Sequence, residues 1–181
     1  MRRFINNILS VVSSIVRFCI LKVFHYRNFS FYGIQRFSPN TSIEIDKGGD
    51  FSLGNKVRAH SGVKIKVRSG GNLHIGNGVS FNYNCMIFCH EKILIEEGVE
   101  FGPGVLVYDH DHDYNANGGI KAGKFICSPV IIGANSWIGA NSIILRGTII
   151  GKDCVIAAGS VVKGNIPDGT VFIQKRHSQK Y

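Results

Sequence analysis

Two histidines in an aspartate-rich stretch are the residues of this chain best suited to chemistry. His110 and His112 alternate with Asp109, Asp111 and Asp113, near the start of a polar, glycine-bearing stretch at 108–129. Neutral histidine has a pKa near physiological pH and can take the proton of an attacking hydroxyl group. A nearby carboxylate can fix its tautomer and stabilise the imidazolium that forms. The pattern therefore predicts a histidine general base, which would let a hydroxyl attack a thioester without a serine or cysteine nucleophile.

A zinc site is the alternative use of the same side chains. His90, His110 and His112 would give three histidine ligands, the number found in some catalytic zinc sites. Nothing in the sequence indicates that the three converge, and we expect no metal. The cysteines are scattered and form no CxxC pair, so we expect reduced thiols in a cytosolic protein rather than disulfides or zinc ligands. They are Cys19, Cys85, Cys89, Cys127 and Cys154.

A six-residue repeat between Val130 and Val162 predicts the elements that position these side chains. A glycine or alanine follows most of its in-phase aliphatic residues, which are Ile132, Ile138, Ile144, Ile150, Ile156 and Val162. A hexapeptide period is typical of parallel β-helices, in which three hexads make one coil. The aliphatic side chain points inward, and the small residue lets the chain round the corner. The sequence therefore predicts an all-β, parallel β-helix.

The repeat continues less regularly toward the N-terminus. From Phe37 the apolar residues indicate irregular early coils, and regular hexads run up to Val107 with one two-residue slip after Ile87. The period is then lost until Val130. Insertions in a solenoid form loops on one face, which is often the functional one. We therefore expect a β-helix domain at 37–173 with an extruded loop at 108–129, followed by a basic tail at 174–181.

Residues 1–29 are expected to form an amphipathic helix with a basic character. Apolar residues recur there at helical spacing, and no acidic residue precedes Glu44. Arg17 and Lys22 interrupt the apolar run, which argues against a transmembrane helix and a signal peptide. Two roles stay open. The helix could lie on an anionic membrane surface, at the inner face of the cell membrane, or it could be structural and either cap the open end of the solenoid or pack on a neighbouring subunit.

The composition describes one basic globular domain. The chain has 181 residues, 22 of them glycine, and a formal net charge of +9. The glycine content suits a solenoid rich in turns. The charge predicts an anionic partner, such as a membrane or a phosphorylated cofactor. We expect no nucleic acid, because the chain has no recognisable binding module and no dense basic helix.

The run from Val130 to Val162 resembles the hexapeptide-repeat acyltransferases, in particular the maltose, galactoside and polysaccharide O-acetyltransferases. The resemblance covers 72–172 well and 37–71 loosely. It implies a left-handed β-helix, although the usual crossover rule would give a right-handed coil. It also implies a homotrimer with sites between subunits. The implied reaction is acetyl transfer from acetyl-CoA to a saccharide or lipid-linked saccharide hydroxyl, in bacterial surface polysaccharide (capsule, O-antigen or exopolysaccharide) biosynthesis.

Three other functions stay open beside this resemblance. An N-acetyltransferase acting on an amino-sugar nucleotide would be the nearest enzyme. A structural β-helix without chemistry would need neither the histidine-bearing loop nor the outward-facing Trp137. The γ-class carbonic anhydrases share the left-handed β-helix and bind zinc with three histidines across a subunit interface, but their histidine spacing is wider than the His-x-His found here.

The resemblance also implies roles for single residues. In the sugar acetyltransferases the catalytic histidine follows the last in-phase aliphatic residue by five positions, which leads from Val107 to His112. The DHDH sequence, common in the polysaccharide enzymes, would favour His110 instead. We prefer His112. The residues expected to bind the acceptor are Asn82, with Asn84 as its alternative, and His90 and Glu91 in the two-residue slip.

The single tryptophan is expected to face the cofactor. Trp137 lies beside the in-phase Ile138, so its side chain should point outward, either into the CoA cleft between subunits or into the trimer contact. Small residues near it would let the pantetheine arm approach, and basic residues would meet the CoA phosphates. These are Gly139, Ala140, Ala158 and Gly159 for the arm, and Lys163, Lys175 and Arg176 for the phosphates. The segment at 171–176 lacks the glycine and proline of the family's final turn.

Overall fold

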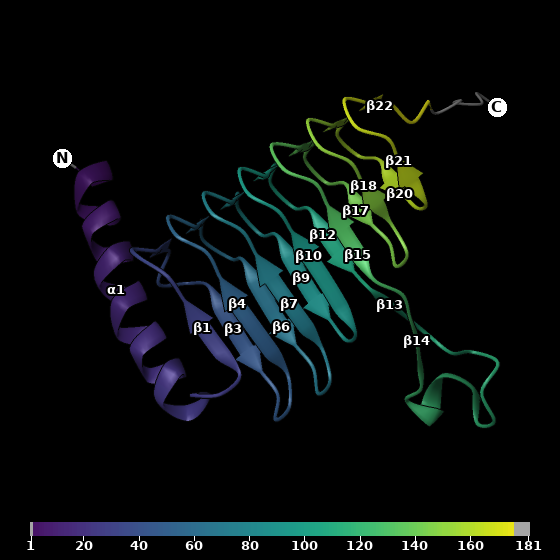
Figure 1. The fold of residues 1–181 in the computed structure, drawn as a ribbon, viewed down its shortest axis with the longest axis horizontal. Helices are drawn as coiled ribbons and strands as arrows, with labels where there is room; N and C mark the ends of the chain where they lie inside the picture. Colours follow the sequence, from purple (N-terminus) through teal and green to yellow (C-terminus); the bar gives the residue numbers. More distant parts are fainter. Residues whose placement is uncertain (1, 176–181) are drawn as a thin grey trace, which may run out of the picture.

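The in-phase apolar residues of the hexapeptide repeat are buried in one core. The chain around this core forms a three-sided solenoid (Figure 1). The computed structural model describes residues 2–175: one N-terminal helix, α1 (Arg2–Phe24), and then a parallel β-solenoid. Each coil gives one strand to each of three parallel sheets, which we name A, B and C in chain order. Sheet C has six strands, so the solenoid has six complete coils.

The strands of the three faces are short. Sheet A comprises β1 (Phe29–Phe31), β4 (Asp50–Leu53), β7 (Asn72–Ile75), β10 (Lys92–Ile95), β15 (Val130–Ile132), β18 (Ile149–Ile150) and β21 (Asn165–Ile166). Sheet B comprises β2 (Arg36–Phe37), β5 (Arg58–Ala59), β8 (Ser80–Phe81), β11 (Glu100–Phe101), β16 (Trp137–Ile138), β19 (Val155–Ile156) and β22 (Val171–Phe172). Sheet C comprises β3 (Ser42–Ile45), β6 (Lys64–Val67), β9 (Met86–Cys89), β12 (Leu106–Tyr108), β17 (Ile143–Ile144) and β20 (Val161–Val162).

The hexapeptide repeat forms the core as predicted. Its six in-phase residues are at most 1% exposed; they are Ile132, Ile138, Ile144, Ile150, Ile156 and Val162. β-Branched side chains suit short strands that bury one face, and their removal from water is the main driving force for folding. The parallel β-helix is therefore confirmed, while its left hand stays an expectation from the resemblance.

The early coils are regular, but they have a longer period than the hexads. Lys64 pairs with Met86, 22 residues further on, whereas Ile143 pairs with Val161, 18 residues further on. The extra residues extend the strands of sheets A and C to four residues each and form the turns between them, as at 70–71. The apolar residues of these coils therefore do not recur every six residues, and their sequence appears irregular when it is compared with a hexapeptide repeat.

Helix α1 closes the N-terminal end of the solenoid. The ring of Phe18, 1% exposed, packs against Phe29, Phe31 and Phe37 with centroid distances of 5.9, 5.5 and 5.1 Å. The Ser14 hydroxyl is buried and accepts a hydrogen bond from the Phe37 N–H at 2.8 Å. The structure thus shows the capping role, one of the two that the sequence left open.

The charged side chains near the middle and end of α1 are directed to the solenoid. Arg17 donates to the carbonyl groups of Pro39 and Thr41, both at 2.9 Å, and to the Thr41 hydroxyl. Lys22 donates to the carbonyl of Phe29 at 2.6 Å. These contacts leave the outer face of the helix apolar. Its exposed members are Ile8, Leu9, Val12, Ile15, Val16, Ile20, Val23 and Phe24.

Two element boundaries in the structure differ from the expected ones. The helix ends at Phe24 rather than at 29, and the solenoid begins at Phe29 rather than at 37, because β1 carries rings that pack on α1. By length and composition the stretch Asn7–Phe24 is also apolar enough to cross a bilayer, despite Arg17 and Lys22. In the structure, however, one side of this stretch lies against the solenoid.

Candidate functional site

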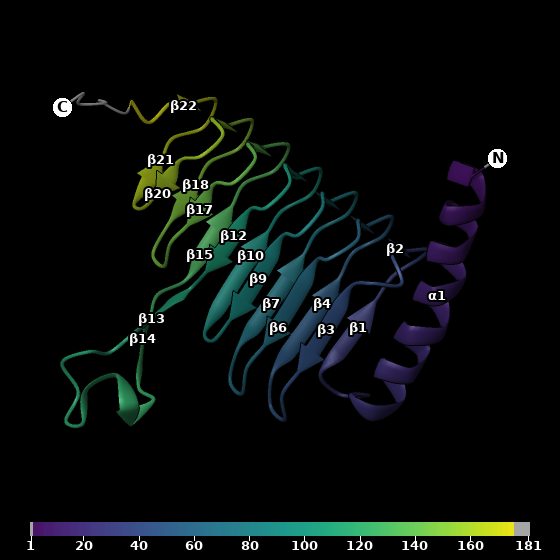
Figure 2. The same cartoon turned by 180° about the vertical axis from the view of Figure 1, so that it is seen from behind.

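The loop at 108–129 is a β-hairpin that extends from the corner where each coil passes from sheet C to sheet A, here called the C/A corner (Figures 1 and 2). Its strands β13 (His110–His112) and β14 (Phe125–Cys127) pair antiparallel, and a short 3-10 helix, η1 (Gly119–Ala122), lies between them. Arg146 on the next coil donates from Nε to Asp111 Oδ2 at 2.6 Å. The base of the hairpin is therefore held against the solenoid.

A buried carboxylate organises this corner. The side chain of Asp109 is fully buried and accepts hydrogen bonds from the backbone N–H groups of His90, Glu91 and Lys92 at 2.7–2.8 Å. Its Oδ1 also lies 3.2 Å from His110 Nδ1. Burial alone would raise the pKa of Asp109, but the hydrogen bonds from His110 and from these backbone groups outweigh it and keep the pKa below its usual range.

This carboxylate sets the tautomer of His110. An ionised carboxylate can only accept, so Nδ1 of His110 carries the hydrogen, and Nε2 of the neutral ring keeps its lone pair. The His110 side chain is only 12% exposed, which holds the ring in place. Nε2 is therefore the nitrogen through which a neutral His110 could accept a proton.

Three further rings complete what we call the His cluster, made of His90, His110, His112 and Phe125. The rings of His90 and His110 lie against each other with their centroids 3.7 Å apart and their planes inclined at 31°. Phe125 contacts His90 at 4.4 Å and His112 at 4.7 Å. Burial, and then the neighbouring His110, lower the pKa of His90. His90 is therefore held in the neutral form beside the proposed base.

The geometry favours His110 over the preferred His112. His112 is exposed and faces Phe125 across the hairpin, and among residues 2–175 no carboxylate is hydrogen-bonded to it. The count of five from Val107 placed His112 because it assumed an undistorted hexad. In the structure the chain leaves the coil at Asp109, so the residue next to the buried carboxylate is His110.

The His cluster does not present a metal site. No group of three or more histidine, cysteine, aspartate or glutamate side chains within the described part of the chain is placed to hold a metal ion. The rings of His90 and His110 are in tilted contact with each other, and His112 lies further out on the hairpin. The arrangement suits proton transfer at one ring.

His90 and Glu91 lie at the C/A corner, but most of the other residues expected to bind acceptor and cofactor lie at a different edge, where each coil passes from sheet B to sheet C, here called the B/C corner. Asn82 and Asn84 follow β8, and Gly139 and Ala140 follow β16. The Asn82 side chain accepts a hydrogen bond from the Tyr83 N–H at 2.9 Å. Asn84 has a positive φ of 60°, so the turn itself accounts for it.

Small residues at the B/C corner are required by packing of the coils. A Cβ on Gly139 would come within 2.5 Å of the Ala158 backbone nitrogen in the next coil. Gly159 has a φ of 71° and donates its N–H to the Ala140 carbonyl at 2.7 Å. Trp137 is 55% exposed and faces outward from sheet B as expected. A cofactor role for this edge therefore depends mainly on Trp137.

Two of the three basic residues expected at the CoA phosphates follow strands of different sheets. Lys163 follows β20 at the C/A corner, whereas Lys175 follows β22 beyond sheet B. Gln174 accepts a hydrogen bond from the Val161 N–H at 2.9 Å, which holds the chain after β22 beside β20. Arg176 lies outside the described residues.

Comparisons with known proteins agree with this architecture. Residues 129–163 match a family model described as the hexapeptide repeat of succinyl-transferase. The galactoside O-acetyltransferase of Lactococcus lactis subsp. lactis is 37% identical over 102 residues, which cover 56% of this chain and 49% of that enzyme. The chain spans about half the length of several curated relatives that it matches.

Two solved structures show the same kind of fold. A maltose O-acetyltransferase from Clostridium difficile 630 has a TM-score of 0.50 and 27% identity, with 81% of this chain and 66% of that chain covered. A single-residue mutant of AntD, an N-acyltransferase from Bacillus cereus solved in complex with dTDP and coenzyme A, has a TM-score of 0.64. Its 23% identity, over 82% of this chain and 80% of that chain, indicates the fold alone.

Proposed function

We propose that the chain is a hexapeptide-repeat acetyltransferase, like the proteins that it resembles, and that it transfers the acetyl group of acetyl-CoA to a hydroxyl group of a saccharide. The hydrogen-bonded pair of Asp109 and His110 is the observation that carries the proposal. The names of the relatives, galactoside and maltose O-acetyltransferase, support a sugar acceptor. We further propose that the acceptor belongs to a bacterial surface polysaccharide or its precursor.

In the proposed reaction His110 acts as the general base. The acceptor oxygen attacks the thioester carbonyl while Nε2 of His110 takes its proton. The carbon–sulfur bond then breaks, and the leaving thiolate of CoA receives a proton from the imidazolium. Asp109 keeps Nδ1 protonated throughout and stabilises the positive charge on the ring between these two steps.

We propose that the complete site lies between subunits of a homotrimer. Asn82 and His90 lie at opposite ends of β9, so one four-residue strand of sheet C separates the two groups of candidate residues. At a rise of about 3.3 Å per residue this distance is about 13 Å, too far for one acceptor hydroxyl to meet both. A second copy that places its sheet B against the His cluster would bring them together, as cyclic symmetry allows.

We also propose that the outer face of α1 rests on an anionic bilayer, from the cytoplasmic side. The exposed face is apolar, and the first 43 residues contain six arginines and lysines and no acidic residue. Tyr26 and Tyr32, 62% and 69% exposed, lie just beyond the helix, and tyrosines favour the headgroup region. Because Arg17 and Lys22 bind carbonyl groups of the solenoid, the apolar face carries more of the binding than the sequence suggested.

The reaction can be tested with the purified full chain. Acetyl-CoA is supplied with a panel of galactosides, maltose and their amino-sugar counterparts, and free thiol and acetylated product are measured. We expect thiol release that depends on the hydroxyl acceptor and an ester product. Acetylation of amino groups alone would support the N-acetyltransferase alternative, and no release with any acceptor would leave the β-helix without the proposed activity.

A further inference from the structure

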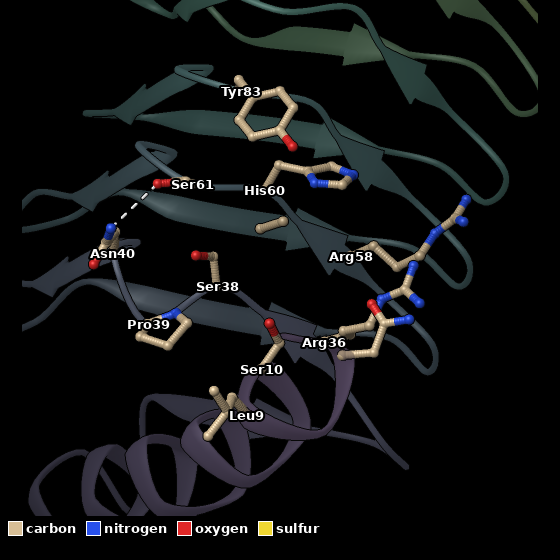
Figure 3. A pocket seen from close by; sticks show the side chains of 12 residues that line it. Leu9, Ser10, Arg36, Ser38, Pro39, Asn40, Arg58, His60, Ser61 and Tyr83 are labelled. Atoms are coloured by element: carbon tan, nitrogen blue, oxygen red, sulfur yellow. Dashed lines mark hydrogen bonds between the residues drawn. The ribbon is translucent and has the colours of Figure 1, made fainter. Parts of the chain in front are cut away.

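A groove that the reaction scheme does not use lies between α1 and sheet B. Its volume is about 840 Å³, and Leu9 and Ser10 of the helix form one wall. Figure 3 shows Arg36, Arg58 and His60 on the opposite wall, at the N-terminal end of the solenoid. The groove is therefore formed by the cap and the first coils, away from the His cluster.

The groove is positively charged. Arg36 and Arg58 are neighbours on adjacent strands of sheet B. Arg58 forms an ion pair with Glu100 at 2.9 Å, whereas the guanidinium of Arg36 has no hydrogen-bond or ion-pair partner among residues 7–175. Helix α1 contains no acidic residue that could neutralise it. At least one guanidinium is thus free to bind an anion.

The pKa of His60 is affected by the same positive charges. Burial, and then Arg36 and Arg58, lower its pKa, while Glu100 acts in the opposite direction. Its ring lies 4.8 Å from the ring of Tyr83, centroid to centroid. A bound anion beside these two arginines would therefore favour the protonated form of His60.

The remaining lining suits a sugar. Tyr83 is 51% exposed, and aromatic rings of this kind can cover an apolar face of a ligand. Ser38, Asn40 and Ser61 add hydroxyl and amide groups at the same level (Figure 3). Such groups offer hydrogen-bond donors and acceptors to sugar hydroxyls.

The groove is aligned with the residues expected to bind acceptor and cofactor. His60, Asn82 and Gly139 occupy equivalent positions after β5, β8 and β16 at the B/C corner. Since neighbouring strands are about 4.8 Å apart, His60 lies roughly 14 Å from Gly139 along the solenoid, with Asn82 between them. A ligand anchored in the groove could thus extend toward the transfer site.

We propose that this groove binds the phosphate group of a phosphorylated saccharide acceptor, with Arg36 and Arg58 on the phosphate and Tyr83 on the sugar. The claim that the bound saccharide is an acetyl acceptor rests on the proposed function, whereas the claim that the groove binds phosphate does not. Leu9 lines the groove and also belongs to the apolar face of α1. The phosphate can therefore come from a soluble sugar phosphate or from a saccharide linked to a lipid through phosphate.

Binding is tested first, independently of catalysis. Galactose 1-phosphate is titrated into the full chain, and the pKa of His60 is followed by NMR. We expect saturable binding that raises the His60 pKa. Arg36→Gln with Arg58→Gln should weaken binding by tenfold or more, since hydrogen bonds to charged groups are the strong ones. Lys47→Gln, an exposed cation outside the groove, should change nothing.

A substitution with the opposite effect sharpens the test. Glu100→Gln removes the partner of Arg58 and should tighten galactose 1-phosphate binding several-fold. Equal affinity in the wild-type protein, the double arginine variant and Glu100→Gln would overturn the proposal. Thermal unfolding of each variant shows whether it is folded.

Acetyl transfer then identifies the source of the phosphate. The acceptors are galactose, galactose 1-phosphate and a polyprenyl-diphosphate-linked galactose in detergent. We expect a lower KM for at least one phosphorylated acceptor, and the double arginine variant should lose this advantage without losing turnover on galactose. A lower KM for the lipid-linked galactose than for galactose 1-phosphate identifies a lipid source. Equal KM values for these two acceptors show that a free sugar phosphate is sufficient. If nothing is acetylated but galactose 1-phosphate still binds through the arginines, the proposed function fails while the binding site stands.

Discussion

Asp109 Oδ1 lies 3.2 Å from His110 Nδ1, and the same carboxylate accepts three backbone N–H groups from the coil below. This relationship links the fold to the chemistry. The coil supplies a fixed and ionised carboxylate, and the carboxylate fixes one histidine of the hairpin. The hairpin supplies Phe125, whose ring packs on that histidine, and His112, whose ring packs on Phe125.

Replacing Phe18 should destabilise the whole protein. Its ring is 1% exposed and packs on three phenylalanines of the first coil, so Phe18→Ala should cost about 3–5 kcal/mol of unfolding free energy. Val16→Ala on the exposed face of the same helix should change it by less than about 0.5 kcal/mol. Urea denaturation of both variants measures this. Equal stability would mean that α1 does not cap the solenoid in solution.

Because α1 caps the solenoid, membrane binding is better tested by substitutions than by deletion of the helix. Deleting residues 1–29 would remove Phe18 and the cap, so point substitutions on the outer face are preferable. Val16→Glu with Ile20→Glu should weaken sedimentation with anionic vesicles about tenfold or more, since each side chain loses apolar burial and gains a charge.

The matched control for that substitution is Ile120→Glu, an exposed isoleucine in η1 on the distal hairpin. It should sediment like the wild-type protein. High salt should reduce, but not abolish, binding of the wild-type protein, because salt screens the basic residues and not the apolar face. Equal sedimentation of the helix variant and the control would exclude the bilayer as the partner of α1.

The intersubunit site predicts complementation between inactive variants. His110→Ala and Trp137→Ala should each be nearly inactive alone, because each removes one half of the site. Subunits mixed in equal amounts and allowed to form trimers should recover about a quarter of wild-type activity, because some neighbours then contribute an intact His110 and an intact Trp137. Mixtures no more active than the two parents would place the whole site within one chain.

The lowered pKa of His90 predicts a pH-dependent loss of stability. The unfolded chain binds a proton at His90 as the pH falls through about 6.5, before the folded chain does. Unfolding free energy contributed by neutral His90 is therefore fully present above that pH and declines below it. Asp109, whose pKa is lowered from 3.8, stays ionised throughout this window.

The measurement compares the wild-type protein with His90→Gln by urea denaturation at pH 7.5 and pH 5. His60 titrates in both proteins and cancels in the difference. The wild-type protein should lose more unfolding free energy than the variant on going to pH 5. An equal loss in both would show that burial near His110 does not restrain His90.

Much of the solenoid could be predicted because its rule is local. The inward position of each in-phase residue, such as Ile138 or Ile156, can be predicted from the six-residue period alone. Six consecutive residues that fit this period specify the core. The longer early coils were predicted but described as irregular, because their extra residues lie in extended strands, where the period is 2 and not 6. Lys64 pairs with Met86, 22 residues further on, and a count of six-residue repeats cannot detect a coil of this length.

The candidate site could be predicted only in part. The histidine-bearing loop was found because the repeat stops there, but the choice between its histidines depends on where the chain leaves the coil. One signal was present: Val105, Val107 and Asp109 alternate inward, and a charged residue at an inward position needs partners. The groove beside α1 was missed because Leu9, Arg36 and Tyr83 are far apart in the sequence.

The most direct test of the account is the turnover of His110→Ala and His112→Ala with acetyl-CoA and a galactoside acceptor, measured side by side with CoA affinity. Loss of a general base should lower turnover by about 100-fold or more in His110→Ala, with CoA affinity unchanged. His112→Ala should keep most of its turnover. Loss of turnover in His112→Ala with near-normal turnover in His110→Ala, or near-normal turnover in both, would contradict the role assigned to Asp109 and His110.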